Sequence, residues 1–364
     1  MEQNAQRELR LANPEWTVRE LMAHVSKALT SDGPALAFGK VQSAKVASRV
    51  SIVVGTTGSS GTSKEVGLSA SAVITSAKAS NTYLGAADGD TWSLLLPLTH
   101  IAAINVLVRA QLLGTEPIDL RGEGSQYPKV DFTAIVPAQL FTALNSDSAL
   151  LQHLKEAKAV LVGGAALSDS LRRQGEAAGI NIVTTYGMTE TCGGCVYNGT
   201  ALDGVEISIT AENRIAIKGT VLAETYIGAQ TQWDAAIKDG WFISSDLGQI
   251  DNGKLIIEGR SDDVIISGGE NISLGQIESA LQDRFPDLLC AAFSIKDMQW
   301  GDSLHLAVVG SKLPTEADIN SYLAVEIGEY AKIKRFLHLS ELPLMGIGKV
   351  DRKKLAQLSM EASD

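Results

Sequence analysis

The segment 56–64, TTGSSGTSK, combines glycines and hydroxyl side chains with a closing lysine. Glycines let backbone amides approach an anion, hydroxyls donate further hydrogen bonds, and lysine adds a positive charge. The apolar run 50–54 precedes this segment, and Ser69 opens a helix-like stretch after it. The order of strand, small-residue turn and helix therefore predicts a cradle for phosphate groups. A flexible surface turn is the alternative for the segment taken alone. Because Ser63 stands where a P-loop has glycine directly before its lysine, the segment is not a P-loop.

Two further segments carry side chains suited to a nucleotide. The run TYGMTE at 185–190 follows an apolar stretch, and its tyrosine, threonine and glutamate could stack on a base, contact a phosphate and hold a divalent cation. Asp246 follows two serines at the expected end of a short strand, where a carboxylate can accept both hydroxyls of a ribose. An ordinary strand end and a solvated hairpin carboxylate are the alternative interpretations.

Charged and glycine-rich turns recur toward the C-terminus. GRSDDVIISGGENIS at 259–273 combines an arginine, paired aspartates and a Gly-Gly turn, and GIGKVDR at 346–352 places Lys349 directly after a glycine-rich turn. A linker with a hairpin, and a solvated tail lysine, explain these segments equally well when each is considered alone.

The cysteines and histidines do not indicate a metal or redox centre. Cys192 and Cys195 have the C-x-x-C spacing, but Cys290 alone cannot supply a second ligand pair for zinc, and the five histidines are scattered. Small residues lining a pocket wall are the preferred interpretation of this segment. His100 precedes an apolar helical stretch at 101–113, where it could be structural or could gate a cleft.

Composition limits the class of protein. The 364 residues are 45% hydrophobic and 20% charged, which is typical of globular proteins and long enough for two domains. A net charge of −11 argues against general binding to nucleic acid or anionic membranes. No apolar signal core or membrane-length run is present, and three cysteines do not make a disulfide framework. We expect a cytoplasmic protein.

The elements that must position these residues alternate along the chain. Apolar runs at 51–54, 91–98, 131–138, 159–164 and 181–187 alternate with helical stretches, which predicts parallel α/β layers. Short alternating strands after Gly204 predict a β-rich subdomain, and the last hundred or so residues have a separate α+β pattern. We therefore predict a large N-terminal domain at 1–260 and a small C-terminal domain at 261–364.

Taken in order, these segments resemble the AMP-forming acyl- and aryl-CoA ligase superfamily. The resemblance is carried by TTGSSGTSK, PLTH with His100, VGGAAL, TTYGMTET, DGWFISSDLG, GRSDDVIISGGENIS and GIGKVDR, which span residues 50–352. It implies an ATP-dependent ligase that uses Mg²⁺ and coenzyme A, forms an acyl-adenylate with release of pyrophosphate, and then forms a thioester.

The resemblance also implies a role for individual residues. The phosphate loop would be Thr56, Thr57, Gly58, Ser59, Ser60, Gly61, Thr62 and Lys64. Gly163, Gly164 and Ala165 would line the adenine, with Tyr186 stacking on it and Gly187 beside it. Thr189 would contact the α-phosphate, and Glu190 would bind magnesium. Asp246 and Arg260 would hold the ribose, Asp262 would be the hinge, and Lys349 the adenylation lysine. His100 would lie where the acyl pocket meets the thiol tunnel, and Gly268 and Gly269 would line that tunnel in a second conformation.

The chain departs from the superfamily pattern in two places. Ser63 replaces the proline that usually precedes the lysine of the phosphate loop, which bears on the rigidity of the loop. The region before the loop is also much shorter than in typical members.

The short chain, with VLVRA, IVPAQL, GGCVYNG and LDGVEI, is most similar to the compact o-succinylbenzoate–CoA ligases of actinobacterial menaquinone synthesis. The alternatives are a ligase for another aromatic or acyl acid and a non-catalytic nucleotide-binding protein on the same fold. Arg109 is a candidate for meeting a second substrate carboxylate, although its helix position could be structural. The oligomeric state stays open, with a homodimer as one alternative.

Overall fold

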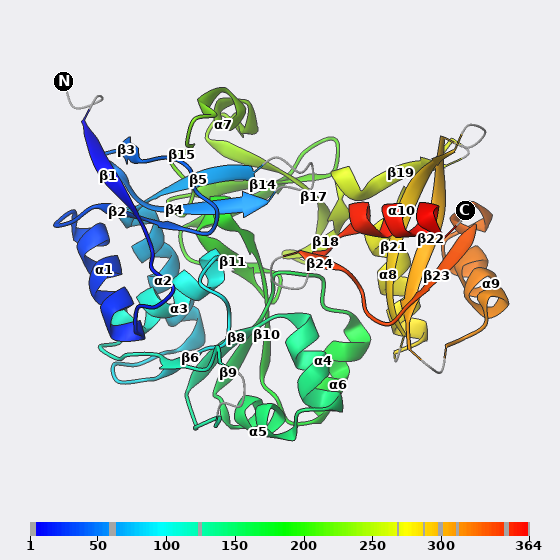
Figure 1. Cartoon of the computed structure of the whole chain (residues 1–364), viewed down its shortest axis with the longest axis horizontal. Coiled ribbons are helices and arrows are strands. Elements are labelled where there is room, and N and C mark those ends of the chain that lie inside the picture. The colour runs from blue at the N-terminus through cyan, green and yellow to red at the C-terminus, as the bar shows by residue number, and fades with distance from the viewer. Residues whose placement is uncertain are drawn as a thin grey trace.

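The computed structural model describes residues 5–57, 63–122, 126–267, 269–286, 288–297, 301–310, 313–345 and 349–362, with the side chains of Thr57, Ser63, Met345 and Lys349 left out. Within these ranges the chain is mixed α/β, with large sheets in its N-terminal part and an α+β C-terminal part (Figure 1). The predicted fold class is confirmed by this architecture and by the structural comparisons reported below.

Two sheets carry the N-terminal part. The first has the order β15-β5-β4-β2-β1-β3 and the second β12-β11-β10-β9-β8-β6-β7. The strands of the first sheet are β1 (Gln6–Leu11), β2 (Ala35–Phe38), β3 (Lys45–Ala47), β4 (Val50–Thr57), β5 (Ser63–Ser69) and β15 (Thr225–Tyr226). Those of the second are β6 (Trp92–Leu94), β7 (Ile118–Asp119), β8 (Phe132–Ile135), β9 (Ala159–Val162), β10 (Ile182–Met188), β11 (Gly193–Tyr197) and β12 (Thr200–Ala201).

Helices cover these sheets because their apolar faces require burial. In α1 the capping box of Thr17 and Glu20 satisfies the first turn, and Leu21 and Val25 are fully buried. The helices of this part are α1 (Val18–Thr30), α2 (Ala70–Leu84), α3 (Ile101–Leu112), α4 (Pro137–Asn145), α5 (Ser148–Glu156), α6 (Asp169–Ala177) and α7 (Gln230–Ala236). One hydrophobic cluster joins α1, α2 and α3 to both sheets, and a second packs α4 and α5 on the other side of β9. All four residues of β9 are buried, as expected for a central parallel strand.

The predicted β-rich segment forms a third, antiparallel sheet. It contains β13 (Val205–Ile209), β14 (Arg214–Gly219), β16 (Ile237–Lys238), β17 (Trp241–Asp251) and β18 (Lys254–Arg260). Burial alternates along β17, so one face packs inward and the other is more exposed.

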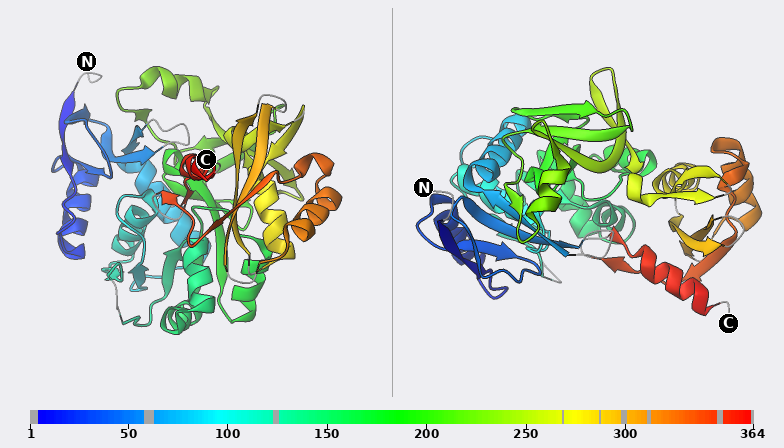
Figure 2. Two further views of the ribbon diagram at one scale, coloured as in Figure 1. Left: turned by 45° about the vertical axis from the view of Figure 1, so that its right-hand side comes forward. Right: turned by 90° about the horizontal axis from the view of Figure 1, so that it is seen from above.

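The C-terminal part follows a short 3₁₀ turn at Ser261–Asp263. Its sheet contains β19 (Val264–Ser267), β20 (Glu270–Ser273), β21 (Leu289–Asp297), β22 (Gly301–Val309) and β23 (Arg335–Leu339). Helices α8 (Leu274–Arg284) and α9 (Glu316–Glu326) pack on one face, and α10 (Arg352–Glu361) packs on the other. Two short strands, β24 (Leu344–Met345) and β25 (Lys349–Val350), pair antiparallel before α10. Figure 1 shows β24 reaching from this part toward β18, and the second view of Figure 2 shows α10 beside it.

Before residue 45, the chain contains β1 and β2 together with α1. The strand β2 pairs in parallel with β1 on one side and with β4 on the other. One local expectation was wrong. The phosphate-loop segment does not lead directly into a helix. It joins β4 to β5, which pair antiparallel from Val50↔Ser69 to Thr57↔Ser63, and α2 begins only after β5. Among the described residues, no helix is long and apolar enough to cross a membrane.

Candidate active site

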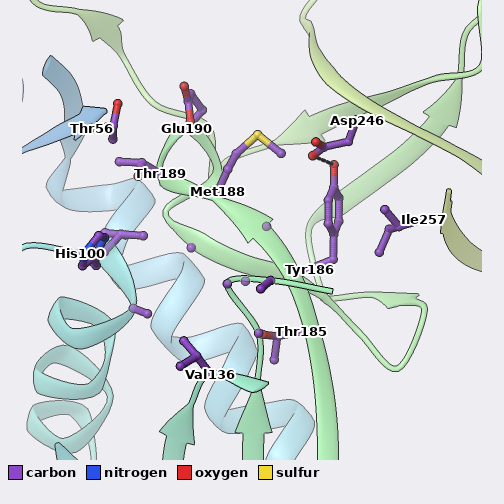
Figure 3. A pocket seen from close by; sticks show the side chains of 18 of the residues that line it. Thr56, His100, Val136, Thr185, Tyr186, Met188, Thr189, Glu190, Asp246 and Ile257 are labelled. Carbon is purple, nitrogen blue, oxygen red and sulfur yellow. Dashed lines mark hydrogen bonds between the residues drawn. The ribbon is translucent and has the colours of Figure 1, made fainter. Parts of the chain in front are cut away.

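A single cleft of about 2460 Å³ runs along the carboxyl ends of the central parallel strands. The loops after β8, β9 and β10 form its floor, and residues of β17 and β18 form one wall. Ligands bind at the carboxyl ends of strands in open α/β sheets, so this placement agrees with a substrate cleft. Figure 3 shows Tyr186, Asp246 and Ile257 on one side of the cleft and His100 on the other.

The pairing register of β17 and β18 positions the residues that are predicted to bind the nucleotide. Asp246 lies directly opposite Arg260 in this antiparallel pair, and Arg260 donates from Nη1 to Asp246 Oδ1 over 2.9 Å. The Tyr186 hydroxyl donates to the other oxygen, Oδ2, over 2.8 Å (Figure 3). Asp246 therefore lies inside an eleven-residue strand, and the expectation that it ends a short one was wrong.

Burial and the charge of Asp246 raise the pKa of Tyr186, so its hydroxyl stays a donor. Burial opposes the charge on Arg260, but its contacts with Asp262 and Asp246 outweigh that effect and raise its pKa. The arrangement is a fixed carboxylate flanked by an aromatic ring, suited to a nucleoside with free ribose hydroxyls.

Glycines shape the adjacent wall. A Cβ on Gly163 would overlap Thr185 Oγ1, and one on Gly187 would overlap the carbonyl of Gly193 across the β10–β11 bulge. Gly164 has φ +81°, which favours glycine in the turn after β9. Ala165 follows it and also lines the cleft. The wall is therefore flat backbone, which leaves room for a planar ring beside Tyr186.

Tyr226, which no sequence motif predicted, contacts two of the residues predicted to bind the phosphates and the metal. Tyr226 lies in β15, which pairs with β5, and its hydroxyl donates to Glu190 Oε1 over 2.7 Å. The Lys64 Nζ lies 4.5 Å from the centre of the Tyr226 ring. Tyr226 therefore contacts both Lys64, which is predicted to bind the phosphates, and Glu190, which is predicted to bind the metal ion. The sequence TYIG carries no motif that marks it.

Thr56 and Thr189 line the same end of the cleft (Figure 3). Gly58, Ser59, Ser60, Gly61 and Thr62 lie outside the described residues, and Thr57 is described only in its backbone. The predicted contacts of this loop with phosphate stay predictions.

The opposite side of the cleft is the region expected for an acyl group. His100 caps α3 without a side-chain bond to its backbone, and burial lowers its pKa, which favours neutral imidazole. Deeper along α3, Arg109 is 3% exposed and donates to the Tyr197 hydroxyl over 3.0 Å. Among the described residues, no carboxylate pairs with its guanidinium, and its Nε has no hydrogen-bond partner.

The C-terminal part contributes one edge of the cleft. Val350, Arg352 and Glu278 line it, and Asp262 lies beside them with its carboxylate accepting two 2.8 Å hydrogen bonds from Arg260. The Lys349 backbone lies in β25, next to Val350, and its side chain is not described. Gly268 lies outside the described residues, and Gly269 has φ +91° and is not among the described residues of the cleft lining.

The cysteines are not among the described residues that line this cleft. Cys192 and Cys195 are buried in the core, and burial raises the pKa of Cys195 to about 12, while Gly193 and Gly194 between them line the cleft. No three His, Cys, Asp or Glu side chains within the described ranges gather to hold a metal ion by themselves.

Comparison with known proteins agrees with this geometry. The model of the family described as AMP-binding enzyme matches residues 5–227. A Mycobacterium tuberculosis protein named probable 2-succinylbenzoate–CoA ligase is 36% identical over 331 residues, which cover 85% of this chain and 84% of the relative. The 2-succinylbenzoate–CoA ligase of Lactococcus lactis is 27% identical over 328 residues, covering 84% and 71%.

Solved structures share the fold. The o-succinylbenzoate CoA synthetase of Bacillus subtilis, in complex with its acyl-adenylate intermediate, gives a TM-score of 0.75 at 23% identity, covering 95% of this chain and 82% of the other. ATP-bound MatB of Rhodopseudomonas palustris gives 0.78 at 20% identity, covering 97% and 84%. From the family match and the 36% identical relative, we conclude that the chain belongs to the AMP-binding enzyme family.

Proposed function

We propose that this protein is an ATP-dependent 2-succinylbenzoate–CoA ligase of menaquinone biosynthesis. The main supporting observation is that the same cleft is lined by the Tyr186–Asp246–Arg260 arrangement on one side and by His100 and the buried Arg109 on the other. The relative that is 36% identical bears this activity in its name. A cytoplasmic location, where ATP and coenzyme A are available, is part of the proposal.

The reaction has two steps. A substrate carboxylate oxygen attacks the α-phosphorus of ATP, the bond from that phosphorus to the bridging oxygen breaks, and pyrophosphate leaves. The thiol of coenzyme A then loses its proton and attacks the acyl carbon, so that the thioester forms and AMP leaves. Neither step requires a nucleophile from the protein, which needs only to position the reactants and stabilise developing charge.

The described residues fit the nucleotide and its metal. Asp246 would accept the ribose hydroxyls, Tyr186 would stack on adenine, and Lys64 would contact the phosphates. Mg²⁺ is commonly held by one or two carboxylates together with substrate phosphates, so Glu190, oriented by Tyr226, suffices from the protein. The bound ion would neutralise charge on the phosphates.

Lys349 would bridge the carboxylate and the α-phosphate in the first step, where a charge-assisted hydrogen bond strengthens as charge develops. Its loss should cost on the order of 10²–10³ in adenylation rate, by analogy with other preorganised donors. The division at 260/261 into a large and a small domain, with Asp262 as the hinge, belongs to the same proposal.

Arg109 would meet the second carboxylate of a dicarboxylate substrate. A buried arginine with no described carboxylate partner is costly, and an anionic ligand would offset that cost. Tyr197 and Trp92, which contact the guanidinium, would keep it in place.

Acid-dependent ATP–pyrophosphate exchange tests this function. We expect exchange with 2-succinylbenzoate and at least about tenfold less with benzoate or a fatty acid, since only the first offers Arg109 a second carboxylate. Arg109→Met should remove most of that preference, with ATP binding checked separately to confirm that the cleft remains folded. Preference for a monocarboxylic acid would support the ligase for another acid. ATP binding without exchange for any acid would support a non-catalytic nucleotide-binding protein.

A further inference from the structure

Arg352 is the first residue of α10 and follows the strand that contains Lys349 by one residue. Its guanidinium contacts three other residues of the C-terminal part. Its Nε donates to the Ala292 carbonyl over 3.0 Å, and its Nη2 donates to Glu278 Oε1 over 2.9 Å. Its Nη1 lies 4.0 Å from Asp263 Oδ2, next to the predicted hinge. The side chains of Arg352 and Glu278 are only 21% and 22% exposed.

Glu278 completes this arrangement from α8. The oxygen that receives Arg352 also accepts the backbone amide of Ala292 over 2.8 Å. Ala292 is fully buried in β21, so both of its backbone groups hold the pair against the core of the C-terminal part. A charged pair with two backbone partners and restricted exposure is far stiffer than an exposed ion pair.

Among the described residues, the segment that contains Lys349 is held by a short strand pair and by Val350, which packs against the hydrophobic cluster beside α10. The strands β24 and β25 pair through only Leu344↔Val350 and Met345↔Lys349. A two-stranded ladder is marginal by itself in water. Downstream, the Asp351 amide donates to the Pro343 carbonyl, and the Asp351 side chain caps α10 through the Lys354 amide. Arg352 is the next residue, and it fixes this short ladder to the body of the sheet.

We propose that Arg352, held by Glu278, is the positioning residue that sets Lys349 in the cleft for the adenylation step. The inference rests on the proposed function, in which Lys349 serves that step alone. Arg352 and Glu278 themselves line the cleft, and Arg352 is only three residues from Lys349 along the chain. Contacts that hold Arg352 therefore also restrict the backbone position of Lys349. A reacting group must be held close to its productive geometry, and a two-residue strand pair with one packed side chain gives weaker positioning than the Arg352 contacts add.

The test separates the two half-reactions. In Arg352→Gln, ATP–pyrophosphate exchange should fall at least about tenfold, while thioester formation from preformed acyl-adenylate should change less than about twofold. Arg352→Lys, which keeps the charge, should recover part of the exchange rate, and Glu278→Gln should reproduce the loss in weaker form.

Arg335→Ala is the matched control. Arg335 donates to the Ala362 carbonyl just beyond the opposite end of α10, and it is not among the described residues that line the cleft. If Arg352 merely stabilises the fold, Arg335→Ala and Arg352→Gln should impair both half-reactions alike, and the proposal would be overturned.

A double-mutant comparison provides a second readout. In the Lys349→Ala background, Arg352→Gln should cause no further loss of exchange, because the positioned group is already absent. A full additional tenfold loss would show that Arg352 acts independently of Lys349 and would overturn the proposal. If the unmodified protein catalyses no exchange with any acid, the proposed function fails instead, so the two failures are distinguishable.

Discussion

Asp246 is the central residue of the part of the cleft that is predicted to bind the nucleotide, because both Tyr186 and Arg260 contact it. It is 8% exposed, and its two oxygens receive Arg260 and the Tyr186 hydroxyl. A buried carboxylate needs such partners, because an isolated charge would be costly to remove from water. The two contacts also fix the direction in which the carboxylate faces the cleft, which is what a ribose requires.

Removing only the Tyr186 hydroxyl should weaken nucleotide binding while leaving the aromatic ring in place. A hydrogen bond to a charged group contributes about 1.5–3 kcal/mol, and Arg260 would still hold the other oxygen. Because the hydroxyl acts on ATP only by orienting Asp246, only part of this energy should be lost, and we expect Tyr186→Phe to raise the KM for ATP by about threefold to tenfold with little change in kcat. Steady-state kinetics over a range of ATP concentrations measures this.

Tyr83→Phe is the control, since Tyr83 is 39% exposed and is not among the described residues that line the cleft, although its ring packs edge-on against the lining residue Tyr197. An unchanged KM in Tyr186→Phe would mean that the hydroxyl does not orient Asp246 for the nucleotide.

At the scale of elements, the antiparallel pair β4–β5 fixes the positions of the two strand ends that the predicted phosphate loop connects. The two strands pair along their whole length, and Val66 and Leu68 of β5 are fully buried. The strand β4 ends at Thr57, β5 begins at Ser63, and α2 begins only after β5, so we do not expect a helix dipole to contribute if this loop binds phosphate. In the proposed function, backbone amides, hydroxyls and Lys64 would supply that binding.

Ser63 is the first residue of β5, where a proline is tolerated. Ser63→Pro should reduce the conformational freedom of the unfolded chain and stabilise the fold by about 0.4–1 kcal/mol. A stiffer loop should also lower the KM for ATP without changing kcat. Urea unfolding and ATP kinetics check both effects, with Ser63→Ala as the control for loss of the hydroxyl. A less stable Ser63→Pro variant would show that the amide or torsion angle of Ser63 is needed in the ladder.

The sequence predicted most elements because their periodicity is strong, as in β9 and the alternating β17. It failed at β5, where the short run SKEVGLS lies next to a helix start and has only two inward-facing apolar side chains. It also predicted Tyr186, Asp246 and Arg260 as site residues without showing that they contact one another. That contact depends on the register of β17 and β18, which contains a bulge between Leu247 and Gly248 that no local pattern specifies. Tyr226 was missed because its role depends on the pairing of β15 with β5, far away in the sequence.

At the scale of the whole molecule, the orientation of the C-terminal part suits the first half-reaction. Val350, Arg352 and Glu278 face the cleft, whereas Gly269, expected to line a thiol tunnel, is not among the described lining residues. Among the described residues, hydrogen bonds across the 260/261 boundary include the two from Arg260 to Asp262, one from the Ser170 amide to Asp283 Oδ1 over 3.3 Å and one from the Ser261 hydroxyl to the Ser245 carbonyl over 2.9 Å. Polar contacts of this kind are compatible with the predicted rotation about Asp262.

Locking the backbone at Asp262 should therefore trap the orientation seen here. Proline is tolerated in the first turn of a helix, and Asp262 is the second residue of the 3₁₀ turn Ser261–Asp263. We expect Asp262→Pro to retain ATP–pyrophosphate exchange and to lose thioester formation from preformed acyl-adenylate, because the second step needs a different set of torsion angles at this residue. Asp262→Ala also removes the two hydrogen bonds from Arg260 but leaves the backbone free, so it should retain both half-reactions. If overall turnover in Asp262→Pro equals that of the unmodified protein, Asp262 is not the hinge. If Asp262→Pro and Asp262→Ala lose both half-reactions equally, the effect comes from the missing carboxylate instead.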